Sequence, residues 1–281
     1  MLTPISTVRA ETIVKEINTE GSSPLLILAN DAESYFAKTT VSSVPFVEVI
    51  NEVLAAYFAQ CWSLAVPPFA LVHISQSLVD NYRSEKASLS SRYDACTFDE
   101  QIFFGSRLVA CQVEIDDYFS GPYHQSQMHY FNNPLDLLKI GVFDQWIGNF
   151  DRKPDNPNIL LAECNDGLLA FSPIDHTAAF GYVSNHREVR EELLYREPKK
   201  WLLSHDFVRA IAKFTPPETI SDLQANILAG MEVALDTMDF VFDQIPKSWG
   251  FSEKARNHLK SFLGNQERNE RIASIYLSYL K

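Results

Sequence analysis

A polar loop at residues 148–158 constrains the fold of this chain more than any other stretch. It follows an apolar run at residues 135–147, whose length and periodicity predict a helix. Two short apolar runs come after the loop, at residues 159–161 and 171–174, and Asp166 and Gly167 lie between them. An Asp-Gly pair between apolar runs predicts a β-hairpin. The sequence therefore predicts a helix, a loop and a hairpin in direct succession.

The loop and the end of the hairpin carry candidate catalytic side chains. Asn156 follows Asp151 by five positions, the spacing of a phosphotransferase catalytic loop, in which the acid accepts a hydroxyl proton. The hairpin would return Asp175 beside the loop, so that Asn156 and Asp175 offer oxygen ligands that suit Mg²⁺. Arg152 and Lys153 are candidates for stabilising a transferred phosphoryl group. The same residue types are also ordinary turn chemistry, which leaves a purely structural loop open.

The N-terminal part predicts a second half of the same site. A loop of small residues precedes two strand-like runs at residues 25–28 and 34–38, and its backbone N–H groups could cover phosphates. The loop residues considered for this role are Gly21, Ser22 and Ser23. Lys38 ends the second run, where a lysine can reach nucleotide phosphates. A solvated lysine is the alternative interpretation.

A helix is predicted between Pro45 and Pro67, because its apolar residues recur at helical spacing. Glu48 and Glu52 fall on the opposite face, four positions apart. Such carboxylates are usually solvated, but a nucleotide site would require one of them to pair with Lys38. Farther along the chain, residues 69–74 and 102–110 predict strands. Residues 76–100 predict a polar excursion, and helical patterns recur around 207–211, 220–242 and 252–280.

Composition limits the class of protein. A chain of 281 residues with 46% hydrophobic content can form one domain of two lobes or two small domains. The formal net charge of −12 argues against a nucleic-acid binder or a binder of anionic membranes. The four cysteines show no pair spacing for zinc or a disulfide framework. No signal peptide or membrane-spanning run is visible, so we expect a cytoplasmic protein.

Two stretches of the chain resemble the HipA-like kinases, bacterial serine/threonine kinases with a divergent protein-kinase fold. One stretch is residues 143–148 leading to Asp151 and Asn156, followed by residues 173–175. The other is Asn51-Glu52 within the predicted helix, followed by Leu64 and Val66-Pro67. The resemblance covers roughly residues 20–181. It implies an α+β, two-lobed protein-kinase-like fold. Residues 1–113 would form an N-lobe with an antiparallel sheet and one helix, and residues 114–281 a mostly helical C-lobe.

The resemblance also implies roles for single residues in ATP- and Mg²⁺-dependent phosphoryl transfer. Asp151 would be the catalytic base, and Asn156 and Asp175 would hold Mg²⁺. Lys38 would bind the nucleotide phosphates, and Glu52, rather than Glu48, would hold that lysine in place. Ser22 and Ser23 are candidate autophosphorylation sites, because charge added there would repel the nucleotide phosphates.

The sequence leaves the phosphate acceptor open. The resemblance implies a protein serine or threonine. Arg152-Lys153 stands where the toxin of the family has Gly-His, and the loop is more similar to that of lipid kinases, so a lipid or small-molecule hydroxyl is an alternative. A nucleotide-binding pseudokinase or interaction module without turnover is another. An antitoxin-like partner, the oligomeric state and a contribution of Asn158 to the metal site also stay open.

Overall fold

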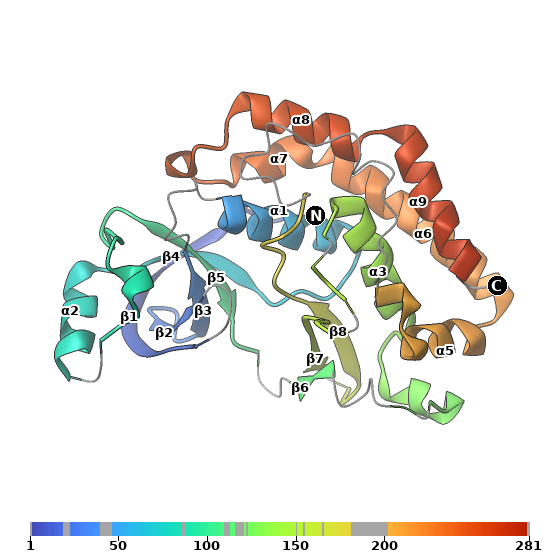
Figure 1. Ribbon diagram of the computed structural model, residues 1–281, viewed down its shortest axis with the longest axis horizontal. Helices are drawn as coiled ribbons and strands as arrows, with labels where there is room; N and C mark the ends of the chain where they lie inside the picture. The colour runs from blue at the N-terminus through green and yellow to red at the C-terminus, as the bar shows by residue number, and fades with distance from the viewer. Residues whose placement is uncertain are drawn as a thin grey trace.

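The fold is α+β and has two lobes. The computed structural model describes residues 2–18, 23–39, 47–85, 88–109, 113–115, 121, 123–149, 151–153, 155–164, 166–180 and 202–279. A barrel of strands occupies one end of the molecule and helices gather at the other, with a small sheet and one helix between them (Figure 1). This arrangement confirms the predicted fold class.

The N-lobe is a closed five-stranded barrel with the strand order β1-β2-β3-β5-β4. Its strands are β1 (Ser6–Glu16), β2 (Leu25–Ala29), β3 (Ser34–Lys38), β4 (Phe69–His73) and β5 (Ile102–Arg107). Four of the pairings are antiparallel, as predicted, but β1 pairs with β4 in parallel. That parallel pairing closes the sheet on itself, which the sequence did not reveal.

Alternation along the barrel strands decides where Lys38 points. Ala37 lies inside the barrel and is fully buried, so its neighbours Phe36 and Lys38 face the other way. Their partners on β5 are Ser106 and Phe104 respectively. Gly105, between those two, faces the packed interior, where an added Cβ would lie 2.5 Å from a methyl carbon of a valine side chain. The packed interior thus fixes the outward direction of the lysine.

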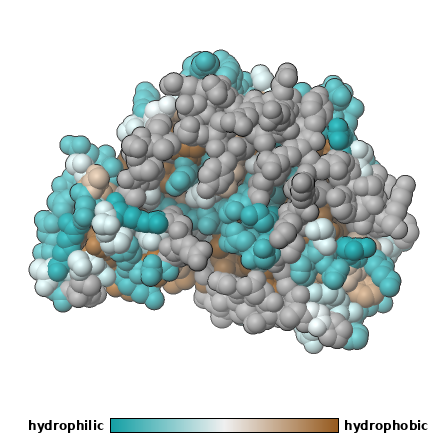
Figure 2. All heavy atoms as spheres, in the orientation of Figure 1, coloured by the Kyte–Doolittle hydropathy of each residue, from teal (hydrophilic) through white to brown (hydrophobic). Residues whose placement is uncertain are grey.

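The polar excursion contains a helix that the sequence did not predict. Helix α2 (Gln76–Glu85) buries only Val79, which leaves almost no apolar periodicity to detect. A short 3-10 helix (Ser91–Tyr93) follows, and Tyr93 and Phe98 stack at 6.0 Å between ring centroids. Figure 2 shows mostly hydrophilic residues at the end of the molecule where α2 lies. The described part of residues 1–113 therefore contains α2 in addition to the one helix expected.

Helix α1 (Val47–Cys61) is buried on nearly every side. Of its residues, only Glu48, Gln60 and Cys61 are not buried. The helix lies between the barrel and the C-terminal helices in Figure 1. The ring of Phe58 packs edge-on against Trp146, with 5.6 Å between centroids. Helix α1 therefore belongs to the hydrophobic core of the helical lobe, although the chain reaches it from a barrel strand.

The helical lobe is built around α3 (Leu135–Ile147), in which all residues but the first two are buried. This helix has the bounds that the sequence predicted. It ends at Gly148, whose φ of 65° is left-handed and whose N–H donates to the carbonyls of Asp144 and Gln145. The surrounding helices are α5 (Asp206–Phe214), α6 (Pro217–Asp236), α7 (Met238–Asp243), α8 (Glu253–Leu263) and α9 (Gln266–Tyr279), with 3-10 turns at Gln125–Tyr130, Leu202–Ser204 and Lys247–Trp249.

A three-stranded sheet contains the predicted hairpin, which follows the loop at residues 148–158. Strands β7 (Ile159–Glu163) and β8 (Leu169–Pro173) pair antiparallel, and β6 (Val113–Glu114) pairs with β7. The predicted lobe boundary between 113 and 114 thus falls inside β6. Among the described residues, no helix combines the length and apolar character needed to cross a bilayer.

Candidate active site

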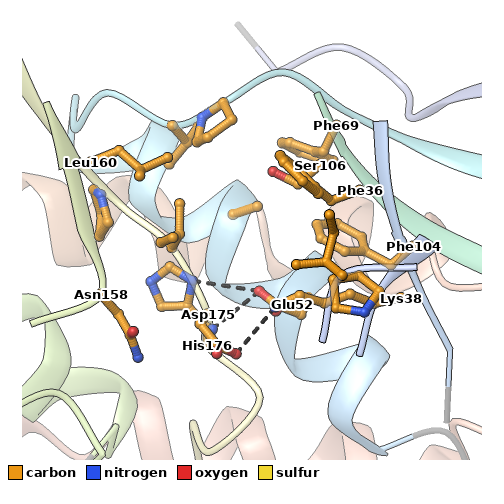
Figure 3. Close-up of a pocket in the computed structure, with 17 residues that line it drawn as sticks. Phe36, Lys38, Glu52, Phe69, Phe104, Ser106, Asn158, Leu160, Asp175 and His176 are labelled. Carbon is orange, nitrogen blue, oxygen red and sulfur yellow. Dashed lines mark hydrogen bonds and ion pairs between the residues drawn. The ribbon is translucent and has the colours of Figure 1, made fainter. Parts of the chain in front are cut away.

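A cavity of about 350 Å³ lies between the barrel and the hairpin. The barrel contributes Phe36 and Phe104 to its lining, the hairpin contributes Leu160, and these side chains make much of the lining apolar. Figure 3 shows Lys38, Glu52, Asp175 and His176 together on one side of this cavity. These four come from a strand, a helix and the end of the hairpin, so the site depends on the assembled fold.

Lys38 pairs with two carboxylates in this cavity. Its Nζ lies 2.7 Å from Oε1 of Glu52 and 3.2 Å from Oδ1 of Asp175. The side chains of Lys38 and Glu52 are 14% and 5% exposed, whereas that of Asp175 is 38% exposed. The predicted partner on α1 is therefore the one in contact, and Glu48 is exposed to solvent. Three predicted site residues meet here, although Lys38 and Asp175 are 137 positions apart in the sequence.

Ion pairing dominates the titration of this pair. Burial alone would lower the pKa of Lys38, but the charges of Glu52 and Asp175 outweigh it, and the pKa is raised above its ordinary value. Burial alone would raise the pKa of Glu52, but the Lys38 charge and His176 outweigh it, and the pKa is lowered. Both shifts favour the charged forms, so the pair is ionised at neutral pH.

The backbone holds Asp175 in an uncommon conformation. Its φ is +56°, a left-handed value that non-glycine residues seldom adopt. The N–H of Ile174 donates to the carbonyl of Asn158 at 2.9 Å, which ties the end of the hairpin to the catalytic loop. Thr177 Oγ1 donates to Oδ1 of Asp175 at 3.0 Å. The carboxylate is therefore directed by local hydrogen bonds as well as by Lys38.

Asp151 and Asn156 are in direct contact. Asn156 Nδ2 donates to the Oδ2 atom and the carbonyl of Asp151, at 3.2 and 3.3 Å. The Asp151 carboxylate is 44% exposed, and Lys153 Nζ lies 3.7 Å from its Oδ1. Asp151 does not line the main cavity. Asn156 lines a smaller cavity of about 120 Å³, which shares three lining residues with the larger one.

Arg152 does not have the role that the sequence suggested. Its side chain is 0% exposed, and its Nε donates to Oδ2 of Asp144 at 2.7 Å. Its Nη1 donates to the carbonyls of Pro157 and Asn158. A side chain enclosed in this way cannot contact a transferred phosphoryl group. Arg152 instead holds the two ends of the catalytic loop together.

The predicted phosphate loop falls mostly outside the described residues. Gly21 and Ser22 belong to that part of the chain, so their proposed roles stay predictions. Ser23 is buried, and its carbonyl accepts a hydrogen bond from the Tyr93 hydroxyl at 2.7 Å. Because Ser23 is buried, its hydroxyl is not accessible for phosphorylation in this conformation. This argues against Ser23 as an autophosphorylation site.

Sequence reasoning missed two residues that organise the site. Asp144 is buried, forms an ion pair with Arg152 and accepts a hydrogen bond from Asn149 Nδ2 at 3.0 Å. An acid inside an otherwise apolar helix was the available signal, because a buried charge requires a partner. His176 donates its backbone N–H to Oε2 of Glu52 at 3.1 Å. No sequence pattern predicts that contact.

Asn156 and Asp175 carry oxygen atoms of the kind that Mg²⁺ prefers as ligands. The Asn156 amide nitrogen is turned toward Asp151, so Oδ1 of Asn156 is left to bind a cation. Asp175 adds a carboxylate that faces the main cavity. Within the described parts of the chain, no three His, Cys, Asp or Glu side chains form a metal-binding cluster. Mg²⁺ on a nucleotide does not need one, because phosphates and waters supply most of its ligands.

The comparisons with known proteins give the family. The profile of the HipA-like kinase family matches residues 10–270, so the chain belongs to this family. The structure of the Helicobacter pylori proinflammatory kinase CtkA is similar with a TM-score of 0.58 and 15% identity, over 99% of this chain and 98% of that one. This likeness shows a kinase fold.

A Golgi casein kinase with Mn and ADP bound matches with a TM-score of 0.42 and 12% identity, over 99% of this chain and 73% of that one. We draw no conclusion from so low a score. A search of curated protein sequences found no match.

Proposed function

We propose that this HipA-like kinase uses ATP and Mg²⁺ and transfers the γ-phosphoryl group to a hydroxyl, with a protein serine or threonine as acceptor. The observation that carries the proposal is the contact of Lys38 with both Glu52 and Asp175 on one side of the cavity. An ion pair between a strand lysine and a helix glutamate, next to a metal-binding aspartate, is the arrangement that kinase catalysis requires. A scaffold without turnover has no need for it.

Each residue at the site has a distinct task in this proposal. Lys38, held by Glu52, binds the nucleotide phosphates and directs them toward Asp175. Asp175 and Asn156 would hold Mg²⁺, which would supply positive charge to the phosphates. The apolar lining around Phe36 and Leu160 suits a nucleotide base.

Asp151 acts on the acceptor. Its partly exposed carboxylate accepts the proton of the acceptor hydroxyl while the oxygen attacks the γ-phosphorus and ADP leaves. Asn156 fixes the orientation of that carboxylate through Nδ2. Lys153, near Asp151 and 39% exposed, is the residue of the loop that remains able to stabilise the transferred group once Arg152 is assigned to the interior.

The test compares Asp151→Asn with Asp155→Asn, the same substitution at an exposed position of the same loop. We expect Asp151→Asn to lower phosphoryl transfer by about 10²–10⁴-fold, because it removes the base. Calorimetric affinity for ATP with Mg²⁺ should stay within about twofold, since Asp151 does not bind the nucleotide. Asp155→Asn should leave both quantities unchanged.

Transfer is measured with labelled ATP and a cell lysate, and phosphoserine or phosphothreonine is identified by mass spectrometry. Equal labelling by the wild type and Asp151→Asn would refute catalysis at Asp151. Label recovered only in lipids or small molecules would show that the acceptor is not a protein. ATP binding without any transfer would identify a nucleotide-binding module. The comparisons lend no support to an antitoxin-like partner.

A further inference from the structure

The turn after Asp175 is held in a conformation that its own sequence does not favour. Residues 175–180 contain no glycine, yet Asp175 and Phe180 have φ values of +56° and +59°. Left-handed conformations at such residues cost free energy and persist only where surrounding contacts impose them. Two backbone bonds contribute: Ala179 N–H donates to the carbonyl of His176, and Phe180 N–H donates to that of Ile147.

Helix α1 supplies further hydrogen bonds through two adjacent residues. Asn51, which is 1% exposed, donates from Nδ2 to the carbonyls of Thr177 at 2.8 Å and Ala179 at 3.0 Å. Both hydrogens of one amide group are therefore used on this turn. The next residue, Glu52, accepts the N–H of His176. Two consecutive residues of α1 thus form hydrogen bonds with three backbone groups of residues 175–180.

We propose that Asn51 is a positioning residue that fixes the turn at residues 175–180 and thereby the direction of the Asp175 carboxylate. This inference rests on the proposed function, in which Asp175 binds Mg²⁺. Glu52 fixes Lys38 and the start of the turn, and Asn51 fixes its middle and end. The lysine and the metal-binding aspartate are consequently placed by the same two residues of α1, so metal binding depends on where that helix lies.

Loss of the Asn51 amide should therefore affect metal use more than nucleotide binding. The carbonyl of the buried Ala179 would lose its donor, which is unfavourable in the protein interior. The turn would relax toward ordinary φ values and carry Asp175 with it. Lys38 and Glu52, whose side chains Asn51 does not contact through these bonds, would keep their pairing.

The experiment compares Asn51→Leu with Asn269→Leu. Leucine has the same number and branching of side-chain heavy atoms as asparagine, but it is bulkier and donates no hydrogen bond. Asn269 is a matched control, because it is also buried and donates from Nδ2 to one carbonyl, that of Leu263 at 2.8 Å, in the α8–α9 region. Should either leucine variant fail to fold, Asn51→Ser and Asn269→Ser replace the pair, since serine is smaller and does not reach both carbonyls.

Two readouts decide the proposal. Native-state hydrogen exchange should show loss of protection of about tenfold or more at the amides of residues 176–180 in Asn51→Leu, and none there in Asn269→Leu. The Mg²⁺ concentration for half-maximal tightening of ATP binding should rise by about tenfold in Asn51→Leu alone, while ATP affinity in EDTA stays within about twofold.

Unchanged protection at residues 176–180 in Asn51→Leu would overturn the proposal, as would an equal loss of protection in the control. Protection lost with unchanged Mg²⁺ dependence would also overturn it, since the turn would then not direct Asp175. A wild type that binds no nucleotide would refute the proposed function instead. In that case the exchange measurement alone decides whether Asn51 holds the turn.

Discussion

At the scale of single residues, the buried ion pair between Arg152 and Asp144 determines the shape of the catalytic loop. Arg152 reaches from the first part of the loop to the carbonyls of Pro157 and Asn158 at its end, while Asp144 anchors it to α3. The guanidinium has the planar set of donors that such a task requires. The loop is thus closed by one side chain, and Asp151 and Asn156 lie within the closed segment.

We predict that Arg152→Met destabilises the protein by about 3–5 kcal/mol, because it leaves the buried Asp144 carboxylate without its partner. The double variant Arg152→Met/Asp144→Leu should recover part of this loss, since it removes the orphaned charge as well. Urea denaturation at neutral pH measures both free energies of unfolding. A loss below about 1 kcal/mol in the single variant would show that the pair contributes little.

Single-residue prediction succeeded where the family resemblance covered the residue. The contact of Lys38 with Glu52, rather than with Glu48, was implied by that resemblance, and it is present. Arg152 was assigned to the transferred group because exposure cannot be read from a loop sequence. Its burial follows from Asp144, eight positions earlier, through a contact that only the folded loop creates. The roles of Asp151, Asn156 and Asp175 toward a nucleotide stay predictions.

At the scale of secondary-structure elements, α9 stabilises the end of α3 from which the catalytic loop begins. Arg268 on α9 is buried and donates from Nη2 to the carbonyls of Gln145 and Trp146, each at 2.7 Å. Its guanidinium also lies 4.0 Å from the ring centroid of Phe262. A cation at a helix C-terminus adds hydrogen bonds to carbonyls of the last turn and interacts favourably with the helix dipole. The C-terminal helix thereby contributes to the site without lining it.

We predict that Arg268→Lys lowers the free energy of unfolding by about 1–2 kcal/mol, because one ammonium group cannot keep both short bonds and the ring contact. Phosphoryl transfer should also slow, since the end of α3 positions the catalytic loop. Arg256→Lys is the control: Arg256 lies 5.9 Å from the Phe242 ring and donates to the Phe242 carbonyl. The control should change stability alone. Equal transfer rates in both variants would contradict the prediction.

Elements with strong local signals were predictable, and those with weak ones were not. Helix α3 and the hairpin of β7 and β8 have a clear apolar period or turn, and both were predicted. Helix α2 has one buried residue and was missed. Helices α6 and α7, predicted as one pattern, are separate because the chain leaves helical geometry at Thr237, whose ψ is 1°. Neither proline nor glycine marks that break.

At the scale of the whole molecule, the cavity between the lobes links ligand binding to stability. A ligand that binds only the folded protein stabilises it, by about 2.7 kcal/mol at a concentration 100 times its dissociation constant. We predict that ATP with Mg²⁺ raises Tm by about 5–10 °C under that condition. Lys38→Met should abolish most of the rise, measured relative to its own ligand-free Tm.

Lys260→Met controls for the loss of a surface lysine, and it should keep the full rise in Tm. EDTA should reduce the rise in the wild type, because the phosphates would then lack their metal. Differential scanning fluorimetry measures all of these shifts. An equal rise in Lys38→Met and the wild type would place the nucleotide outside this cavity.

The two-lobed architecture was implied by motif resemblance, whereas the closure of the barrel was not predictable. Strands β1 and β4 pair in parallel although Ser6 and its partner Ala70 are separated by most of the N-lobe. Pairing over such a distance leaves no turn or spacing signal in the sequence. The same holds for the position of α1, whose near-complete burial became evident only with the helices against which it packs.

The packing of α1 into the helical lobe gives one ion pair a second importance. Lys38 lies on a barrel strand, whereas Glu52 lies on a helix whose neighbours belong to the core of the helical lobe, so their contact joins two separately packed cores. Any displacement of the barrel strand from α1 would have to break this salt bridge.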